Sequence, residues 1–257
     1  MIKAIFLDID GTMVSFDTHR MPDDTASALC EARSRGVKLF VATGRQRGDI
    51  NNLGDMEFDG YITLNGSCCL VDDKVIFRKS IPKEDIVAFV RYQEENGIIP
   101  CFFVEADAIS ANTRADIMER MRELICFPPR LVVSMDELMQ REIYQLTAFF
   151  SQEAEPEVMR QMPHCTATRW YPTFADVVAK GVEKCVGLEV MGAYFGIRPE
   201  EMMAIGDGGN DISMLRYAGI GVAMGNSDEE VKQAADYVTS SIDEGGVAQA
   251  LHHFGII

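Results

Sequence analysis

Residues 1–12 read MIKAIFLDIDGT, an apolar run that ends at Asp8 and continues through Asp10, Gly11 and Thr12. A short apolar run of this kind predicts a β-strand that is buried on both faces, as in a parallel sheet. Open parallel sheets bind ligands just beyond the carboxyl ends of their strands. Asp8 falls at that place, so we expect the first strand to deliver a functional carboxylate.

Two carboxylates as close as Asp8 and Asp10 repel each other unless a cation or a shared proton relieves the repulsion. Oxygen ligands without a neighbouring His or Cys favour Mg²⁺ as that cation. A strand followed by an Asp-Gly turn is the structural alternative, and this motif alone does not decide between the two. An EF-hand loop is excluded, because the twelfth position from Asp8 is His19 and not the required Glu.

The length of the chain limits the number of domains, and its net charge disfavours some classes of partner. The 257 residues are compatible with one large domain or two smaller ones, and 47% of them are hydrophobic, as in a protein with a real core. With 24 basic and 40 acidic residues, the formal charge of −16 argues against nucleic-acid binding and repels anionic substrates at long range. A phosphate site must therefore be built locally, from a metal ion, a few basic side chains and helix N-termini.

We expect no signal peptide, because the first apolar run is short and broken by Asp8. We also expect no membrane-spanning segment, because no apolar stretch reaches the length needed to cross a bilayer. The seven cysteines form no Cys-x-x-Cys motif, and we interpret them as reduced and mostly buried. Together these features predict a cytoplasmic protein with no nucleic-acid or membrane partner. The sequence does not give the oligomeric state, and a monomer is compatible with it.

Strands and helices alternate at both ends of the chain, which favours a doubly wound α/β fold. The expected core strands are 37–42, 61–64, a hairpin over 69–77 that turns at Asp72-Asp73, 202–205, 220–224 and 237–239. The expected core helices are 22–35, a short one after Arg45, 184–195, one starting near Asp207, 228–235 and 245–254.

The pattern changes at Pro82, and the next stretch of about 100 residues, an ordinary domain size, contains no phosphate-type motif. Its expected helices are 82–96, 113–125, a short one capped by Ser134 and Glu137, and 153–161. Its expected strands are 98–104, 142–150, 165–170 and 174–179. We interpret residues 82–180 as an inserted α/β domain, and residues 1–81 with 181–257 as the core.

Polar residues follow two further core strands. Thr43, Gly44 and Arg45 come after the strand 37–42, and a hydroxyl and a guanidinium at that place suit an anion. A Thr N-cap followed by a solvated Arg is the structural alternative. Asn65 follows the next strand, and we take Arg45 and Asn65 as candidates for contacts beyond the phosphate.

A third polar segment, Gly206-Asp207-Gly208-Gly209-Asn210-Asp211, follows the strand 202–205. It is not a dinucleotide fingerprint, because the third glycine lacks the required spacing. Asp211 is expected on the same side as Asp207 of a helix that begins there. An N-cap role for Asp207 alone does not explain why four carboxylates, a Thr and a Lys fall at strand ends or helix starts of one half of the fold.

Together these residues predict phosphoryl transfer. Asp8 can attack phosphorus and form an aspartyl-phosphate, while Asp10 protonates the leaving alcohol and then deprotonates water. Mg²⁺ held by Asp8, the Asp10 carbonyl and Asp207 would offset the charge. The remaining expected roles are donors to the transferring oxygens for Thr43 and Lys184, and completion of the metal shell or orientation of Lys184 for Asn210 and Asp211.

The four motifs, Asp8 to Thr12, Thr43 to Arg45, Lys184 and Gly206 to Asp211, resemble in their order those of the haloacid dehalogenase (HAD) superfamily. The position of the insertion, Asn65-Gly66 and the Asn210-Asp211 ending are similar to the Cof-type sugar phosphatases with an α/β cap of the C2B kind. The resemblance covers nearly the whole chain. The usual Gly-x-x-Lys spacing of the family favours Lys184, preceded by Gly181, over Lys180 as the third motif.

This resemblance implies a Rossmann-like core with a specificity cap, and a phosphoric monoester hydrolase that uses Mg²⁺. It implies small phosphorylated metabolites as substrates, with hexose phosphates foremost. The residues expected to bind substrate or phosphate are Gly11, Thr12, Thr43, Gly44, Arg45, Asn65, Lys184 and Asn210, with Asp211 in support.

Two other functions stay open. A phosphomutase on the same fold returns the phosphoryl group to a sugar, and nothing in the sequence excludes it outright. A receiver-type signalling protein phosphorylated on Asp8 is disfavoured by the inserted domain and by the second acid, Asp10, which promotes hydrolysis. Dehalogenation is disfavoured because Asp10 serves phosphoryl chemistry. The physiological substrate is not fixed by the sequence, because contacts from the inserted domain carry no motif.

Overall fold

The computed structural model describes residues 1–105, 108–112, 119 and 131–257. The chain divides into two compact units, Met1–Phe77 with Glu183–Ile257 and Arg78–Val182, which we call the core unit and the insert unit. The sequence placed the boundaries at 81/82 and 180/181. The role of the insert as a specificity cap stays a prediction. Apart from residue 119, the helix predicted at 113–125 lies outside the described residues.

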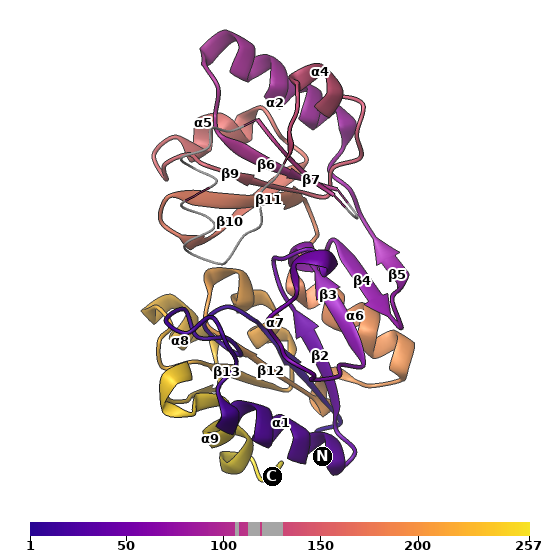
Figure 1. The fold of residues 1–257 in the computed structure, drawn as a ribbon, viewed down its shortest axis with the longest axis vertical. Coiled ribbons are helices and arrows are strands. Elements are labelled where there is room, and N and C mark those ends of the chain that lie inside the picture. The colour runs from indigo at the N-terminus through magenta and orange to yellow at the C-terminus, as the bar shows by residue number, and fades with distance from the viewer. Residues whose placement is uncertain (106–107, 113–118, 120–130) are drawn as a thin grey trace. The chain divides into compact units, whose positions relative to one another are not determined.

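An eight-stranded sheet in the order β14-β13-β12-β1-β2-β3-β4-β5 forms the centre of the core unit (Figure 1). β1 (Ala4–Leu7) lies between β12 and β2 and is parallel to both. The parallel pairing continues outward to β14 and β3, and β4 is antiparallel to β3. The other strands are β2 (Lys38–Ala42), β3 (Gly60–Thr63), β4 (Cys68–Val71), β5 (Lys74–Arg78), β12 (Met202–Gly206), β13 (Ile220–Ala223) and β14 (Tyr237–Val238).

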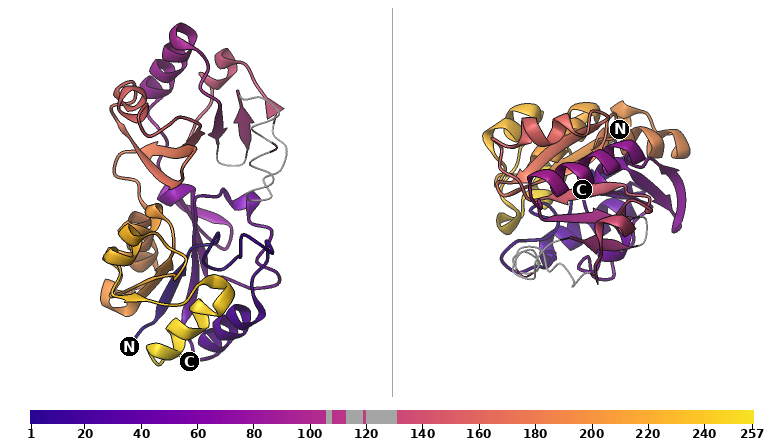
Figure 2. Two further views of the ribbon diagram at one scale, coloured as in Figure 1. Left: turned by 90° about the vertical axis from the view of Figure 1, so that its left-hand side faces the viewer. Right: turned by 90° about the horizontal axis from the view of Figure 1, so that it is seen from above.

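Alternate side chains of β1 enter two separate hydrophobic clusters. Ile5 and Leu7 pack with α1 (Asp23–Ser34) and α9 (Gly246–His253), which lie side by side on one face of the sheet (Figures 1 and 2). Ala4 and Phe6 pack in the other cluster, to which α6 (Lys184–Phe195), α7 (Ile212–Tyr217) and α8 (Glu229–Ala234) contribute. Burial on both faces explains why the strand is apolar throughout, and it confirms the predicted doubly wound α/β core.

Several local predictions for the core are confirmed. α6 runs from Lys184 to Phe195 as predicted, and Gly196 ends it in the left-handed conformation. The hairpin between β4 and β5 turns at Asp72 and Asp73, whose positive φ angles of 49° and 56° are those of a tight two-residue turn. The short helix after Arg45 is a 3₁₀ turn, η1 (Arg47–Asp49).

Two core predictions were wrong in detail. β3 ends at Thr63, because Leu64 and Asn65 adopt φ of 53° and 54° in the 3₁₀ turn η2 (Leu64–Gly66). No helix starts at Asp207 either. The segment Gly209–Asp211 forms the 3₁₀ turn η4 and α7 begins at Ile212, as the poor helix propensity of consecutive glycines explains. Two more 3₁₀ turns are η3 (Pro199–Glu201) and η5 (Ile242–Glu244).

The insert unit has its own six-stranded sheet in the order β10-β11-β9-β6-β7-β8, antiparallel except between β7 and β8. Its cluster of buried residues includes Ile86, Phe89 and Val90 of α2 (Lys83–Asn96), as the sequence predicted. The remaining elements are β6 (Cys101–Val104), β7 (Ile109–Ala111), β8 (Leu131–Val132), α4 (Met135–Leu138), β9 (Gln145–Ala148), α5 (Glu155–Arg160), β10 (Cys165–Tyr171) and β11 (Phe174–Ala179).

In the insert unit, the predicted capping box is confirmed, whereas the bounds of two strands differ from the prediction. The capping box of α4 is formed, with the Ser134 side chain accepting from Glu137 N and the Glu137 carboxylate accepting from Ser134 N. β6 and β9 are shorter than predicted, and β6 starts only after Pro100, which has no N–H for a ladder.

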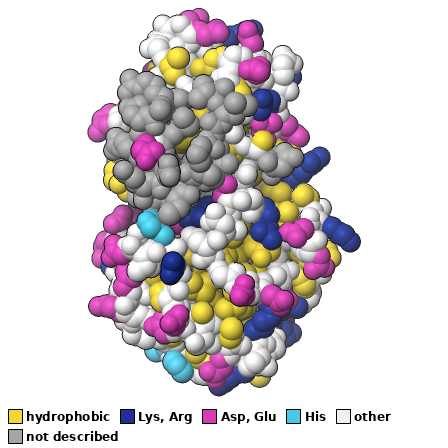
Figure 3. All heavy atoms as spheres, in the orientation of Figure 1, with side chains coloured by type: hydrophobic (Ala, Val, Ile, Leu, Met, Phe, Trp, Pro, Cys, Tyr) yellow, Lys and Arg dark blue, Asp and Glu magenta, His cyan; other side chains and the backbone are white. Residues whose placement is uncertain are grey.

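The charged side chains on the surface (Figure 3) agree with the acidic composition of the chain. Acidic side chains are spread over the visible face with basic ones between them (Figure 3), in keeping with the formal charge of −16. None of the six cysteines in the described part of the chain forms a disulfide. Among the described residues, no helix combines the length and the apolar character needed to cross a membrane.

Candidate active site

Lys184 lies at the centre of a buried charge cluster at the carboxyl edge of the core sheet. Its Nζ donates to Asp8 Oδ1 at 2.7 Å and to Asp211 Oδ1 at 2.5 Å, and the side chain is completely buried. Asp8 follows β1 directly, and Lys184 is the first residue of α6. Lys180, the alternative lysine, is exposed and belongs to the insert unit. The structure therefore brings Lys184 to Asp8, as the spacing of the third motif predicted.

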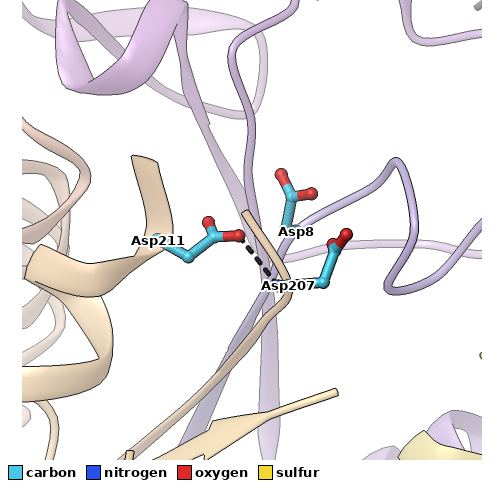
Figure 4. A group of neighbouring side chains, drawn as sticks. All are labelled: Asp8, Asp207 and Asp211. Carbon is cyan, nitrogen blue, oxygen red and sulfur yellow. Dashed lines mark hydrogen bonds between the residues drawn. The ribbon is translucent and has the colours of Figure 1, made fainter. Parts of the chain in front are cut away.

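Asp211 accepts three hydrogen bonds. Besides Lys184, which uses Oδ1, the backbone N–H groups of Asp207 and Gly208 donate to Oδ2 at 3.0 and 2.9 Å. Figure 4 shows the bond that ties Asp211 to Asp207. The predicted proximity of Asp207 and Asp211 thus arises from a side chain that reaches back to the backbone, not from a shared helical face. Asp211 therefore connects Lys184 to the backbone of the loop after β12.

Asp207 is packed against the loop that follows Asp8. Its Oδ1 accepts a hydrogen bond of 2.8 Å from the Thr12 hydroxyl. Gly11 has φ of +85°, and a Cβ added there would lie 2.2 Å from Asp207 Oδ2. Only glycine satisfies both the backbone conformation and this close approach. Gly11 and Thr12 are therefore both matched to the position of Asp207.

The cluster contains more carboxyl groups than cationic groups. Burial raises the pKa of Asp8 to about 7, with Lys184 lowering it and Asp211 and Asp10 adding to the rise. Burial and the neighbouring charges of Asp8 and Asp211 also raise the pKa of Asp207 well above its usual value. Burial alone would lower the pKa of Lys184, but Asp211 and Asp8 outweigh it and raise that pKa, so the lysine stays charged. One ammonium thus faces three carboxylates.

Such a site fits a hard divalent cation. One oxygen each of Asp8, Asp207 and Asp211 lies within 4.8 Å of the others (Figure 4). Asp211 accepts three hydrogen bonds, two of them from backbone N–H groups, so Asp8 and Asp207, which follow adjacent strands, are the better candidates to hold a metal ion. An all-oxygen donor set of this kind favours Mg²⁺.

Arg45 forms a two-point ion pair with Asp10. Arg45 Nε donates to Asp10 Oδ2 at 2.8 Å and Nη2 donates to Oδ1 at 2.5 Å. Burial opposes the charged form of Arg45, but Asp10 and its neighbours raise the pKa of the guanidinium above its ordinary value. The Arg45 backbone N–H donates to the Thr43 hydroxyl oxygen at 3.1 Å, and Thr43 is almost completely buried. The segment Thr43 to Arg45 is thus tied to the loop that carries Asp10.

Asn65 and Asn210 meet across the sheet edge, with Asn210 Nδ2 donating to Asn65 Oδ1 at 2.9 Å. The Asn65 backbone N–H also donates to the Thr43 carbonyl at 3.0 Å. A Cβ added at Gly66 would lie 2.2 Å from the Glu183 carbonyl, so η2 touches the residue before α6. Direct contacts therefore connect the segments after β2, β3 and β12 that carry the predicted residues.

Asn226 is a site residue that sequence reasoning missed. It follows β13, and its Nδ2 donates to the Gly11 carbonyl at 2.9 Å and lies 3.4 Å from Asp207 Oδ2. Its Oδ1 accepts from Ile242 N at 3.1 Å. The signal was present, because Asn226 follows a parallel core strand as Asp8 and Asp207 do. A carboxamide is weaker chemical evidence than a carboxylate, and it was given no role.

Comparison with known proteins places this site in a family. Residues 5–251 match the haloacid dehalogenase-like hydrolases. The chain belongs to this family. It is 31% identical to the putative phosphatase YkrA of Bacillus subtilis, over 99% of this chain and 98% of that one. It is also 29% identical, over 100% of its length, to a putative bifunctional phosphatase/peptidyl-prolyl cis-trans isomerase from Streptococcus pyogenes. The match covers 54% of that longer protein.

Among solved structures, the HAD subclass IIB sugar phosphatase BT4131 is 47% identical, with a TM-score of 0.95 over 99% of this chain and 100% of that one. The predicted superfamily, its Cof-type branch and the enzyme class, a phosphoric monoester hydrolase, are therefore confirmed for this HAD-family chain. The roles predicted for its individual site residues stay predictions.

Proposed function

We propose that the protein is a Mg²⁺-dependent phosphatase that hydrolyses small phosphate monoesters, hexose phosphates foremost, through an aspartyl-phosphate on Asp8. The observation that carries this proposal is the buried Asp8–Lys184–Asp211 bridge at the carboxyl edge of a parallel sheet. A charged lysine that binds one oxygen of Asp8 leaves the other oxygen, Oδ2, outside that bond. The carboxylate is thereby fixed for nucleophilic attack.

In the first half-reaction, Asp8 Oδ2 forms a bond to phosphorus while the bond from phosphorus to the leaving alcohol oxygen breaks. Asp10, two residues further along the same loop, gives a proton to that oxygen. Lys184 stays protonated and offsets the charge near Asp8. The Thr43 hydroxyl oxygen already accepts the Arg45 N–H, so its own hydrogen is available for a phosphate oxygen.

In the second half-reaction, Asp10 accepts a proton from water as the water oxygen bonds to phosphorus. The bond from phosphorus to Asp8 breaks, and inorganic phosphate and free Asp8 are restored. A metal ion would be held by Asp8, Asp207 and the Asp10 carbonyl, and when bound it supplies positive charge between the carboxylates and the phosphate. The hydrogen bond from Thr12 to Asp207 fixes one of these ligands.

The substrate class is supported by the relatives and by the organisation of the chain. BT4131, which is 47% identical, is described as a sugar phosphatase. The core residues handle only the phosphoryl group, so discrimination between leaving groups falls to the inserted domain, as it does for lids in general. We assign residues 82–180 as that cap, with Asn65 and Asn210 as core residues near the bound ester. Small phosphorylated metabolites are therefore the expected partners.

A panel of hexose, pentose, triose and nucleoside monophosphates tests the proposal, with phosphate release measured in Mg²⁺ and in a chelator. We expect hexose phosphates among the best substrates by kcat/KM, and no turnover without a divalent cation. Asp8→Asn should abolish turnover while circular dichroism stays unchanged. Asp17→Asn, an exposed residue of the same type, serves as the control. Normal turnover by Asp8→Asn would refute the covalent mechanism, and a preference for nucleotides would refute the substrate class.

A further inference from the structure

Arg45 is held by protein groups on several sides. Its Nε and Nη2 bind the two carboxylate oxygens of Asp10, and Nη1 donates to the Asp49 carbonyl at 3.2 Å. The Arg45 carbonyl accepts from Leu64 N at 3.1 Å, and its side chain is only 9% exposed. A planar guanidinium fixed in this way has one orientation. The carboxylate that it grips from two nitrogens is fixed in turn.

These contacts argue for a different role from the substrate contact that the sequence suggested. A residue that reaches a leaving group needs donors directed into the site, whereas these donors are directed at Asp10 and at η1. The proposed chemistry asks Asp10 to give up a proton and later to take one, and both transfers depend on where its oxygens point.

We infer that Arg45 is a positioning residue that aligns the carboxylate of Asp10 for acid and base catalysis. The inference rests on the proposed function and deepens it. When Asp10 gives its proton to the leaving oxygen, negative charge develops on a carboxylate that already faces the guanidinium, so no reorganisation is needed. When water attacks the aspartyl-phosphate, the same fixed carboxylate accepts the proton.

A leaving-group test separates this role from substrate contact. A sugar alkoxide needs a proton to leave, whereas p-nitrophenolate leaves without one. Misaligned Asp10 therefore slows the first half-reaction of a hexose 6-phosphate. With p-nitrophenyl phosphate, the misaligned Asp10 leaves the rate of the first half-reaction unchanged and slows the second half-reaction, in which water must be deprotonated. Phosphorylated Asp8 then accumulates.

The variants are Arg45→Lys, which keeps the charge but loses the two-point grip, and Arg45→Met, which loses both. General acid–base catalysis contributes about 10²–10⁴-fold, and we expect Arg45→Lys to lose about 10–100-fold of kcat on hexose 6-phosphate, with KM changed less than about threefold. With p-nitrophenyl phosphate, rapid mixing should show a burst of one nitrophenolate per enzyme followed by slow turnover. Arg47→Met is the matched control, because Arg47 pairs with Asp73 and lies over the Tyr61 ring.

A double-mutant cycle with Asp10→Asn completes the test and does not depend on Arg45→Met folding. If Arg45 acts through Asp10, Arg45→Lys should change the Asp10→Asn rate less than about twofold, whereas independent effects multiply. The inference is overturned if Arg45→Lys raises KM at unchanged kcat, if it slows both substrates equally without a burst, or if its full effect persists beside Asp10→Asn. Failure of the proposed function is seen separately, as wild-type enzyme that hydrolyses no phosphate ester.

Discussion

Replacing Lys184 by Met removes the ammonium between Asp8 and Asp211 and leaves an apolar chain of similar length in the buried site. Removing one partner of a buried ion pair costs about 3–5 kcal/mol, because the remaining charge is left uncompensated. At about pH 8.5, above the pKa of about 7 of Asp8, we expect a loss of folding free energy in that range. Activity should fall at least about 10²-fold, as for loss of a donor at the reacting group.

The loss should shrink at lower pH. Lys184 lowers the pKa of Asp8, which burial nevertheless raises to about 7. Without the lysine that pKa rises further, so the folded variant takes up protons at a pH where the unfolded chain does not. Stability of the variant relative to wild type therefore improves as pH falls. At about pH 5.5 we expect a residual loss of about 1–2 kcal/mol, from the hydrogen bonds that Lys184 no longer donates.

Urea unfolding followed by circular dichroism, with chelator present at both pH values, measures these losses. Lys180→Met is the control, because Lys180 is exposed and lies in the insert unit. Equal destabilisation at the two pH values, or equal effects of the two lysine substitutions, would refute the assignment of Lys184 as the counter-charge of the cluster.

Three further outcomes are expected. Gly11→Ala should lower kcat/KM, measured by steady-state kinetics, by about 10²-fold, because the new Cβ displaces Asp207 and a shift of about 1 Å in a catalytic group can cost that factor. An unchanged kcat/KM would contradict the close contact between Gly11 and Asp207. Asn226→Ala should weaken Mg²⁺ binding by about tenfold in calorimetry, as loss of a residue that supports a ligand does, whereas unchanged affinity would make its bond to Gly11 merely structural. Metal-free wild type should lose stability as pH rises from about 4 to 7, because the folded state keeps protons on Asp8 and Asp207 that the unfolded state has released. Saturating Mg²⁺ should remove that slope in urea unfolding, and a metal-free protein that gained stability over this range would contradict the raised pKa values.

The fold and the acidic cluster were predictable because they depend on position along strands. An apolar run that ends in a carboxylate identifies a buried parallel strand, and the carboxyl ends of such strands meet at one edge of the sheet. Asp8 and Asp207 follow adjacent parallel strands, as that reasoning requires. Lys184 needed the spacing of a family motif, since nothing in its local sequence distinguishes it from Lys180.

What the sequence did not predict depends on side-chain partners across the sheet. Arg45 could have faced the substrate or the protein, and only the fold brings Asp10 within reach of its guanidinium. Leu64 and Asn65 both adopt the left-handed backbone conformation, which Asn tolerates but which the Leu side chain does not favour. Asn226 follows a core strand, but it carries no charge, and its position alone did not predict the contact with the Gly11 carbonyl.

Because β1 lies between β2 and β12, its two edges are paired at different times during synthesis of the chain. Thr12 and Asp207, which share a hydrogen bond, are separated by 195 residues. At about 5–20 residues per second, a ribosome needs about 10–40 s to cover that interval. During this time β1 can pair with β2, but its other edge waits for β12. The nascent chain therefore carries an apolar strand with an unpaired edge, which is prone to association with other chains. Products that stop before β12 keep that edge and lack Asp207, so they add to aggregation without adding to catalysis.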